Sequence, residues 1–179
     1  MPKVSNSDAQ LIEQLHALVF QNAETQALVE DGFNRAFAQF DEPDYALPYV
    51  SYNLPITHFE EALSPEERGR VGLCRVFILK AGCQMPKAEI HRNSIQRLVS
   101  YKGKGAIHSA QPGGVDKSFS PCAIHSPLDS TTPYTDCWDV VPQNTWHFPF
   151  ADEQEDWFTV TFHSASDADI VDEHAEFDS

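Results

Sequence analysis

The part of the chain beyond Gly69 is a succession of strand-length segments, rich in β-branched and aromatic residues and separated by Gly, Pro, Asn and Asp. The clearest segment alternates Phe158, Val160 and Phe162 with Thr and His residues, so it has one apolar and one polar face. Many short strands at close spacing are typical of a β-sandwich or β-barrel. The segments expected to be strands are residues 71–80, 88–92, 95–102, 105–109, 119–125, 137–141 and 156–164.

The first forty residues have a helical pattern instead. Ser7 with Gln10 three positions later forms a capping-box pattern, and apolar residues follow at helical spacing. A second helix is expected over about 24–40 and a short third helix over 57–63. We therefore expect a helical extension over 1–69 that packs on a barrel over 70–165, followed by an acidic C-terminal tail over 166–179.

The tail is expected to be solvated because it is acidic and poor in apolar residues. Only Ile170, Val171 and Phe177 offer apolar side chains that would dock it against the body of the protein. We therefore expect the barrel to fold without this segment.

Length and charge exclude several classes of protein. At 179 residues the chain suits a single domain. A formal net charge of -15 disfavours nucleic acid as a partner, and no apolar run approaches the roughly 20 residues of a membrane-spanning helix. The four cysteines form no Cys-x-x-Cys pair, and the first residues lack the apolar run of a signal peptide. We therefore expect a cytoplasmic protein with neither a membrane partner nor a nucleotide cofactor.

Two phrases carry metal-ligating residue types on short strands beside turn formers: residues 89–103 and residues 142–147. In the first phrase, strand alternation places Glu89 and His91 on one face. It places Gln96 and Leu98 on the corresponding face of the next strand, so both sets can point into one barrel, whereas Arg97 points outside.

The first phrase resembles the first motif of the cupin family, which has a Gly, two His one residue apart, a Glu and a later Gly. Here the matching residues are Gly82, Glu89, His91, Gln96 and Gly103. Glu thus replaces the leading His, Gln replaces the Glu, and one extra residue follows the first Gly. The spacing is that of the family, but two of its ligand positions are substituted.

The second phrase resembles the second cupin motif, in which a Pro, a Gly and a His are followed by an Asn. Pro142, Asn144 and His147 match in spacing, and Asn is a residue that tolerates the left-handed backbone a Gly would supply. Asp136 stands at the motif's first Gly position and Ala151 at its terminal Asn position. The resemblance covers about residues 70–165 and does not extend to the helical start.

The resemblance implies a mainly β protein, a double-stranded β-helix or jelly-roll barrel with its site inside. It also implies that Glu89, His91 and His147 bind a divalent metal such as Fe, Mn, Ni or Zn, as two imidazoles and one carboxylate. Gln96 would add a weak neutral oxygen. Barrels of this type also occur without a metal, and an altered ligand set is what the loss of an ion would leave behind.

Five further residues are candidates for contact with a small ligand. The strand that carries His163 is expected to line the same cavity as the metal-ligating residues, and Gln96 or Tyr101 would orient a substrate there. Arg92 lies near a strand end, where it would reach an anionic ligand, and Trp146 flanks the second motif, where it would wall a pocket. The sequence names no catalytic residue.

Three functions are consistent with this pattern. The first is a metal-dependent enzyme acting on a small organic molecule, dioxygenase-like or an isomerase or lyase. The second is a non-enzymatic, metal-free barrel that binds or senses a small ligand. The third is a metal-free sugar epimerase, which would need a His base facing a Tyr acid. An exposed sheet edge would make a homodimer in each case.

Overall fold

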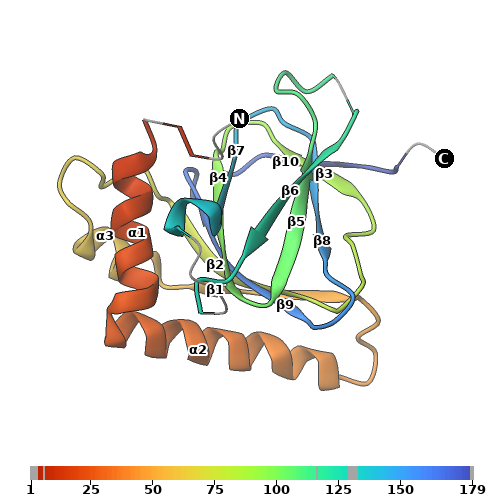
Figure 1. Ribbon diagram of the computed structural model, residues 1–179, viewed down its shortest axis with the longest axis horizontal. Helices are drawn as coiled ribbons and strands as arrows, with labels where there is room; N and C mark the ends of the chain where they lie inside the picture. The colour runs from red at the N-terminus through yellow and green to blue at the C-terminus, as the bar shows by residue number, and fades with distance from the viewer. Residues whose placement is uncertain (1–3, 6, 116, 129–132, 178–179) are drawn as a thin grey trace.

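The computed structural model of the protein describes residues 4–5, 7–115, 117–128 and 133–177. Within these residues, ten strands form two antiparallel five-stranded sheets (Figure 1). Sheet A has the order β1-β2-β9-β4-β7 and consists of β1 (Tyr49–Leu54), β2 (Leu73–Leu79), β9 (Trp157–His163), β4 (Gln96–Lys102) and β7 (Trp138–Val141). Sheet B has the order β10-β3-β8-β5-β6 and consists of β10 (Asp172–Ala175), β3 (Ala88–His91), β8 (His147–Ala151), β5 (Lys104–Ser109) and β6 (Ser120–His125).

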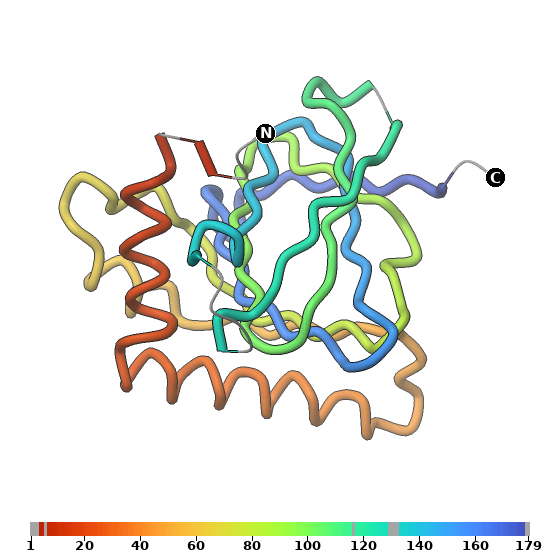
Figure 2. The backbone as a smooth tube through the Cα atoms, in the orientation of Figure 1, coloured from red at the N-terminus to blue at the C-terminus, as the bar shows by residue number. Residues whose placement is uncertain are grey.

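Three helices cover the outer face of sheet A, and the tube in Figure 2 shows two of them running along the outside of the β structure. The helices are α1 (Ala9–Gln21), α2 (Ala23–Ala38) and α3 (Ile56–Ala62), with 3-10 turns η1 (Gln39–Asp41) and η2 (Tyr134–Asp136). The helical extension is thereby confirmed. It is not wholly helical, because β1 lies within it and pairs with β2 along its full length.

The alternation expected along β9 separates two environments. Phe162 and Val160 face outward into an apolar core shared with the helices, where Phe33 and Phe59 are also buried. Full burial of one such side chain contributes about 1.5–3 kcal/mol. His163 and the other polar residues of β9 face inward, toward the space between the sheets.

The helical extension is anchored by a buried ion pair. Arg97 points outward from β4 as alternation predicts, but it is buried beneath α1 and only 1% exposed. Its Nε and Nη2 atoms donate to Asp8 Oδ1 at 2.9 and 2.7 Å. The capping-box prediction is therefore wrong: the N-cap of α1 is Asp8, which makes no side-chain capping bond because its carboxylate binds Arg97.

Strand β8 lies at the centre of sheet B between β3 and β5, although residues 147–151 are not among the segments expected to be strands. Pro149 in the middle of the strand lacks an N–H group, and proline is normally confined to sheet edges. Its carbonyl is nevertheless used, as the acceptor for Met85 N at 3.3 Å. This strand is the one that carries His147 into the sheet.

The segment expected to be a solvated acidic tail instead supplies β10, which pairs with β3 along its whole length. Pairing through the backbone does not require apolar side chains. One of the acidic residues, Glu173, also forms an ion pair with Arg92 at 2.7 Å. Phe177 then packs on Phe148 with ring centroids 4.7 Å apart. No helix in the described ranges is both long enough and apolar enough to cross a membrane.

Candidate metal centre and pocket

The candidate metal ligands of the two phrases lie on neighbouring strands of sheet B, whereas Gln96 of the first phrase lies on β4 of sheet A. Glu89 on β3 is directly opposite His147 on β8, and the backbone N–H of Asn144 donates to the carbonyl of His91 at 2.9 Å. Asn144 has a φ of 57°, the left-handed conformation that its place in the second motif predicts. The turn before β8 therefore brings His147 beside the ligands of the first phrase.

His147 is held in the tautomer that a metal requires. Its Nδ1 atom lies 3.0 Å from the carbonyl oxygen of Thr145, so Nδ1 carries the proton and donates it. The other ring nitrogen, Nε2, is buried, lies 3.4 Å from Oε1 of Glu89 and makes no hydrogen bond of normal geometry. A buried polar atom of this kind is rare, and an ion bound between Nε2 and the carboxylate is one arrangement that would satisfy it.

The ring of His91 is held from both sides. Nδ1 lies 2.5 Å from Asp172 Oδ1 on β10, and Nε2 lies 2.8 Å from Gln96 Oε1 on β4. Burial lowers the pKa of His91, but the hydrogen bond to Asp172 and the charge of Glu89 outweigh it, so the pKa is raised above its usual value. Both nitrogens face oxygen acceptors, so the protonated ring donates from both, and binding of a metal at Nε2 would displace one proton.

Glu89 is the anionic member of the group. Burial raises the pKa of Glu89, but the imidazoles of His147, His91 and His163 outweigh that effect and lower the pKa to about 2. Its Oε1 atom lies 3.4 Å from His147 Nε2 and 4.0 Å from His91 Nε2. The carboxylate is therefore ionised and aimed at both imidazoles.

These three residues fit a divalent ion. One donor atom from each lies within 4.8 Å of the others, and ligands bound to an ion at about 2.0–2.2 Å are themselves roughly 3–3.5 Å apart. Small side-chain movements would close the set. Because Glu89, His91 and His147 provide only three donors, positions on the ion would stay open for a substrate.

Two further imidazoles adjoin this group. His163 on β9 is opposite Gln96 in the sheet, and its ring centroid lies 4.8 Å from that of His91. Burial, followed by the charges of His91 and Arg75, lowers the pKa of His163 well below its usual value, so this side chain is neutral. Its Nδ1 atom is buried without a hydrogen-bond partner. His174 on β10 is half exposed, with Nε2 lying 3.9 Å from Glu89 Oε2.

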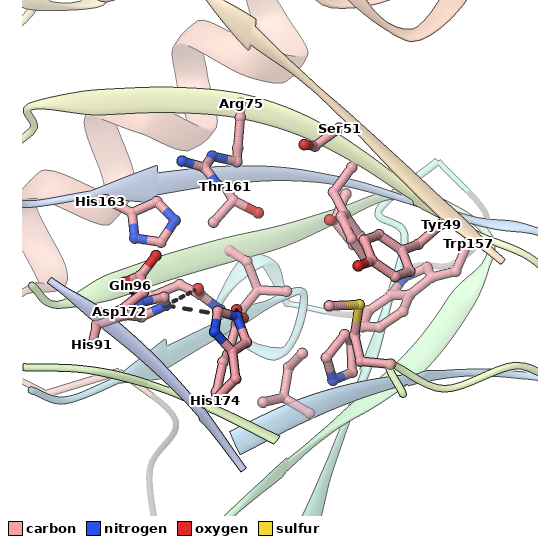
Figure 3. Close-up of a pocket in the computed structure, with 17 residues that line it drawn as sticks. Tyr49, Ser51, Arg75, His91, Gln96, Trp157, Thr161, His163, Asp172 and His174 are labelled. Carbon is pink, nitrogen blue, oxygen red and sulfur yellow. Dashed lines mark hydrogen bonds and ion pairs between the residues drawn. The ribbon is translucent and has the colours of Figure 1, made fainter. Parts of the chain in front are cut away.

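A cavity of about 220 Å³ lies between the sheets beside these groups. Figure 3 shows its two ends: His91, His163 and Arg75 gather at one, and Tyr49 and Trp157 lie at the other. The apolar part of the wall consists of Phe77, Met85, Leu98, Ile107, Pro149 and Trp157. Glu89 and His91 therefore lie at one end of a pocket whose other end is apolar, whereas His147 is fully buried behind Glu89 and does not itself line the cavity.

The structure brings together Gln96 and His163, but not the other three expected ligand-binding residues. Tyr101 faces outward beneath the helices, where its hydroxyl donates to Glu30 at 2.6 Å. Arg92 is paired with Glu173 of β10. The indole N–H of Trp146 donates to the carbonyl of Gly114, a contact in a loop. Tyr101, Arg92 and Trp146 do not line the cavity.

Asp172 and His174 reach the pocket from β10 and were not predicted to do so from the sequence. Their alternation as Asp-x-His was a weak signal within an acidic segment. Arg75 and Thr161 also line the pocket and were not predicted. They lie opposite one another on β2 and β9, and alternation along each strand is the signal that places them on the inward face.

No family model matches the sequence, and no curated protein matches it. Solved structures do resemble this fold. A structure of oxalate oxidase in complex with the substrate analogue glycolate matches with a TM-score of 0.51 and 12% identity, over 72% of this chain and 56% of the other. The capsular polysaccharide assembling protein CapF from Staphylococcus aureus matches with a TM-score of 0.50 and 13% identity, over 75% of this chain and 33% of the other.

This chain therefore spans about half of the oxalate oxidase and a third of CapF. At these identities the likeness concerns the fold, and both proteins are cupin-fold proteins. The paired sheets and the placement of the two motifs agree with it. The protein has the cupin fold, a double-stranded β-helix with helices added at its N-terminus.

Proposed function

We propose that the protein is a metal-dependent enzyme that acts on a small organic molecule inside the barrel, by oxygenase-like or by isomerase or lyase chemistry. The observation that carries the proposal is the unpartnered Nε2 atom of His147, which faces Glu89 and His91. Bound there, a divalent Fe, Mn, Ni or Zn ion would supply Lewis acidity and a template for the substrate.

The protein's own residues define what else the site does. Hydrogen bonds at Nδ1 fix both imidazole rings: the carbonyl of Thr145 holds His147, and the carboxylate of Asp172 holds His91. The lowered pKa of His163 keeps its ring neutral, so its Nδ1 atom is available to accept a proton from a bound substrate. The apolar end of the cavity excludes water from the reacting molecule.

A metal-free binding or sensing barrel is the second candidate, and one contact favours it. Gln96 already satisfies Nε2 of His91 at 2.8 Å, so one ligand position has a protein partner without an ion. In that case the imidazolium of His91 would itself recognise an anionic ligand.

Reconstitution tests the choice. Protein stripped with a chelator would be loaded with Fe(II), Mn(II), Ni(II) or Zn(II) and incubated with a panel of small organic acids, with products followed by NMR and dioxygen uptake by an electrode. We expect turnover with at least one metal, its loss in His147→Ala, and its retention in His125→Ala, which alters an exposed histidine on β6. Ligand binding by stripped protein, with no turnover under any metal, would favour the sensing barrel.

Two features bear on the cellular setting. The structure gives no disulfide bond to any of the four cysteines, which supports a reducing compartment such as the cytoplasm. Strand β6 is an edge of sheet B and largely exposed, which supports a homodimer formed through this sheet. We include both in the proposal.

A further inference from the structure

We infer that the pocket selects a monocarboxylate with an apolar body, and that Arg75 is the residue that holds the carboxylate. This inference rests on the proposed function, because it places the carboxylate beside the metal-ligating group. It concerns the substrate class and the second half of the pocket.

Arg75 is the cation of the pocket wall. It stands on β2 opposite Thr161 of β9, and both line the cavity. Its Nη2 atom donates at 3.2 Å to Asp167, whose side chain is 61% exposed. Its Nε atom is buried and has no partner within the described part of the chain. One side of the guanidinium is thus bound at the surface, and the other retains a buried, unused donor.

The charges of the pocket favour an anion. The lining contains one guanidinium, Arg75, and two carboxylates, Glu89 and Asp172. A divalent ion would balance these two carboxylates. The guanidinium of Arg75 would then be shared only with Asp167, whose side chain is 61% exposed. A largely exposed carboxylate is screened by water, so the side of the guanidinium that faces the cavity favours a ligand of negative charge.

The polar and apolar residues lie on different sides of the cavity, and this separation specifies what the carboxylate of the ligand is attached to. Figure 3 shows Arg75, Thr161 and His163 on the same side as His91, with Tyr49 and Trp157 away from them. A carboxylate held at the polar side would direct its substituent along the apolar wall. Oxalate or glycolate would leave this wall uncovered, whereas an aryl or alkyl group would bury it, at about 25 cal/mol for each Å² removed from water.

The size of the cavity limits the substituent. A volume of about 220 Å³ is smaller than the roughly 300–1,000 Å³ typical of sites for drug-sized ligands. One six-membered ring or a short branched chain therefore suits it better than a sugar nucleotide or a fatty acid. Phenylacetate represents the inferred class, and phenylacetamide is its uncharged counterpart of the same shape.

The test measures equilibrium binding of phenylacetate, phenylacetamide and glycolate to Mn(II)-loaded protein by calorimetry. We expect phenylacetate to bind about ten- to hundredfold more tightly than phenylacetamide, the range expected for hydrogen bonds to a charged group. We also expect it to bind more tightly than glycolate. Arg75→Gln should abolish the preference for the carboxylate over the amide, and Arg75→Lys should retain part of it.

Two matched variants serve as controls for the Arg75 substitutions. Arg92→Gln removes another partly exposed arginine that pairs with a carboxylate but does not line the cavity, and it should leave the preference unchanged. Asp167→Asn removes the outer partner of Arg75 and should not weaken phenylacetate binding, which separates loss of the ligand contact from loss of the surface ion pair.

The outcomes are distinguishable. Protein that binds Mn(II) but shows no preference for phenylacetate over phenylacetamide, or an unchanged preference in Arg75→Gln, overturns the inference and leaves the proposed function standing. Protein that binds none of Mn(II), Fe(II), Ni(II) and Zn(II) overturns the proposed function and the inference with it. A preference lost in Arg92→Gln instead would move the anion site to the rim of the barrel and contradict the role of Arg75.

Discussion

His91 Nδ1 and Asp172 Oδ1 lie 2.5 Å apart and join the first ligand strand, β3, to the last strand of the chain, β10. The bond fixes the ring of a metal-ligating residue from a segment that the sequence presents as an acidic tail. A carboxylate behind a ligating imidazole orients the ring and increases its basicity. The C-terminal strand is therefore part of the site as well as of the sheet.

The pH dependence of the metal-free protein tests this bond. The raised pKa of His91 means that its pair with Asp172 stabilises the fold fully below about pH 6.5, and this stabilisation is lost as the pH rises through the folded-state pKa. Asp172→Asn removes it. The difference in free energy of unfolding between wild type and variant, measured by urea unfolding with a chelator present, should shrink between about pH 6 and pH 9.

His163 affects stability in the opposite direction over part of this range, because its lowered pKa removes stability as the pH falls below 6.5. The residue is present in both proteins, so the difference isolates the pair. A difference that does not change with pH would contradict the assigned role of Asp172.

Removal of residues 172–179 should weaken both the fold and the site. It deletes the pairing of β10 with β3 and the packing of Phe177 on Phe148. We expect a loss of about 2–3 kcal/mol, or roughly 4–10 °C in melting temperature, and a 10- to 100-fold weaker affinity for Mn(II), as for other outer partners of metal ligands. Phe177→Ala keeps β10 and should lower the melting temperature alone. A truncated protein that melts and binds like wild type would show that β10 is dispensable.

Gln96→Glu should strengthen metal binding. The side chain already lies 2.8 Å from Nε2 of His91, and the substitution replaces a neutral oxygen with an anionic one, so affinity for Mn(II) should rise by about tenfold. In metal-free protein the new carboxylate is a second buried anion near Glu89, which destabilises the fold. Melting curves with and without Mn(II) should therefore differ more for the variant than for wild type. A destabilised variant indifferent to Mn(II) argues for the metal-free barrel.

The buried pair of Asp8 and Arg97 should matter more for stability than any surface pair. Asp8→Ala leaves the guanidinium of Arg97, 1% exposed, without its carboxylate. We expect a loss of about 3–5 kcal/mol in the free energy of unfolding, measured in urea. Asp31→Ala breaks a pair with Arg35 in which both side chains are 58% exposed and should cost less than about 1 kcal/mol. Similar losses in the two variants would refute the anchoring role.

The sequence predicts the inward and outward faces of the strands well, because alternation is a local property that the fold preserves. Glu89, His91 and Gln96 face the cavity as expected, and Arg97 faces outward. The segments that pack against the outward face are distant in the sequence, so the burial of Arg97 under α1 could not be predicted.

The features that the sequence did not predict correctly, strands β8 and β10 and the position of Tyr101, each have a different physical explanation. Strand β8 contains Pro149, which sequence rules assign to edges. Strand β10 is acidic and is held by backbone pairing and ion pairs with β3 and its flanking residues, which depend on tertiary structure. Tyr101 was assigned to the site on residue type, but its position on β4 places it on the opposite face from Gln96.

The central claim is that Glu89, His91 and His147 bind a divalent ion. The most direct measurement is Mn(II) titration of chelator-stripped protein, with free Mn(II) followed by electron paramagnetic resonance. We predict one tightly bound ion per chain in wild type and in the exposed-histidine control His125→Ala, and affinity weaker by at least about 100-fold in His147→Ala, which removes the unpartnered Nε2 atom. Wild type that binds no Mn(II), or His147→Ala that binds it as tightly as wild type, would contradict the claim.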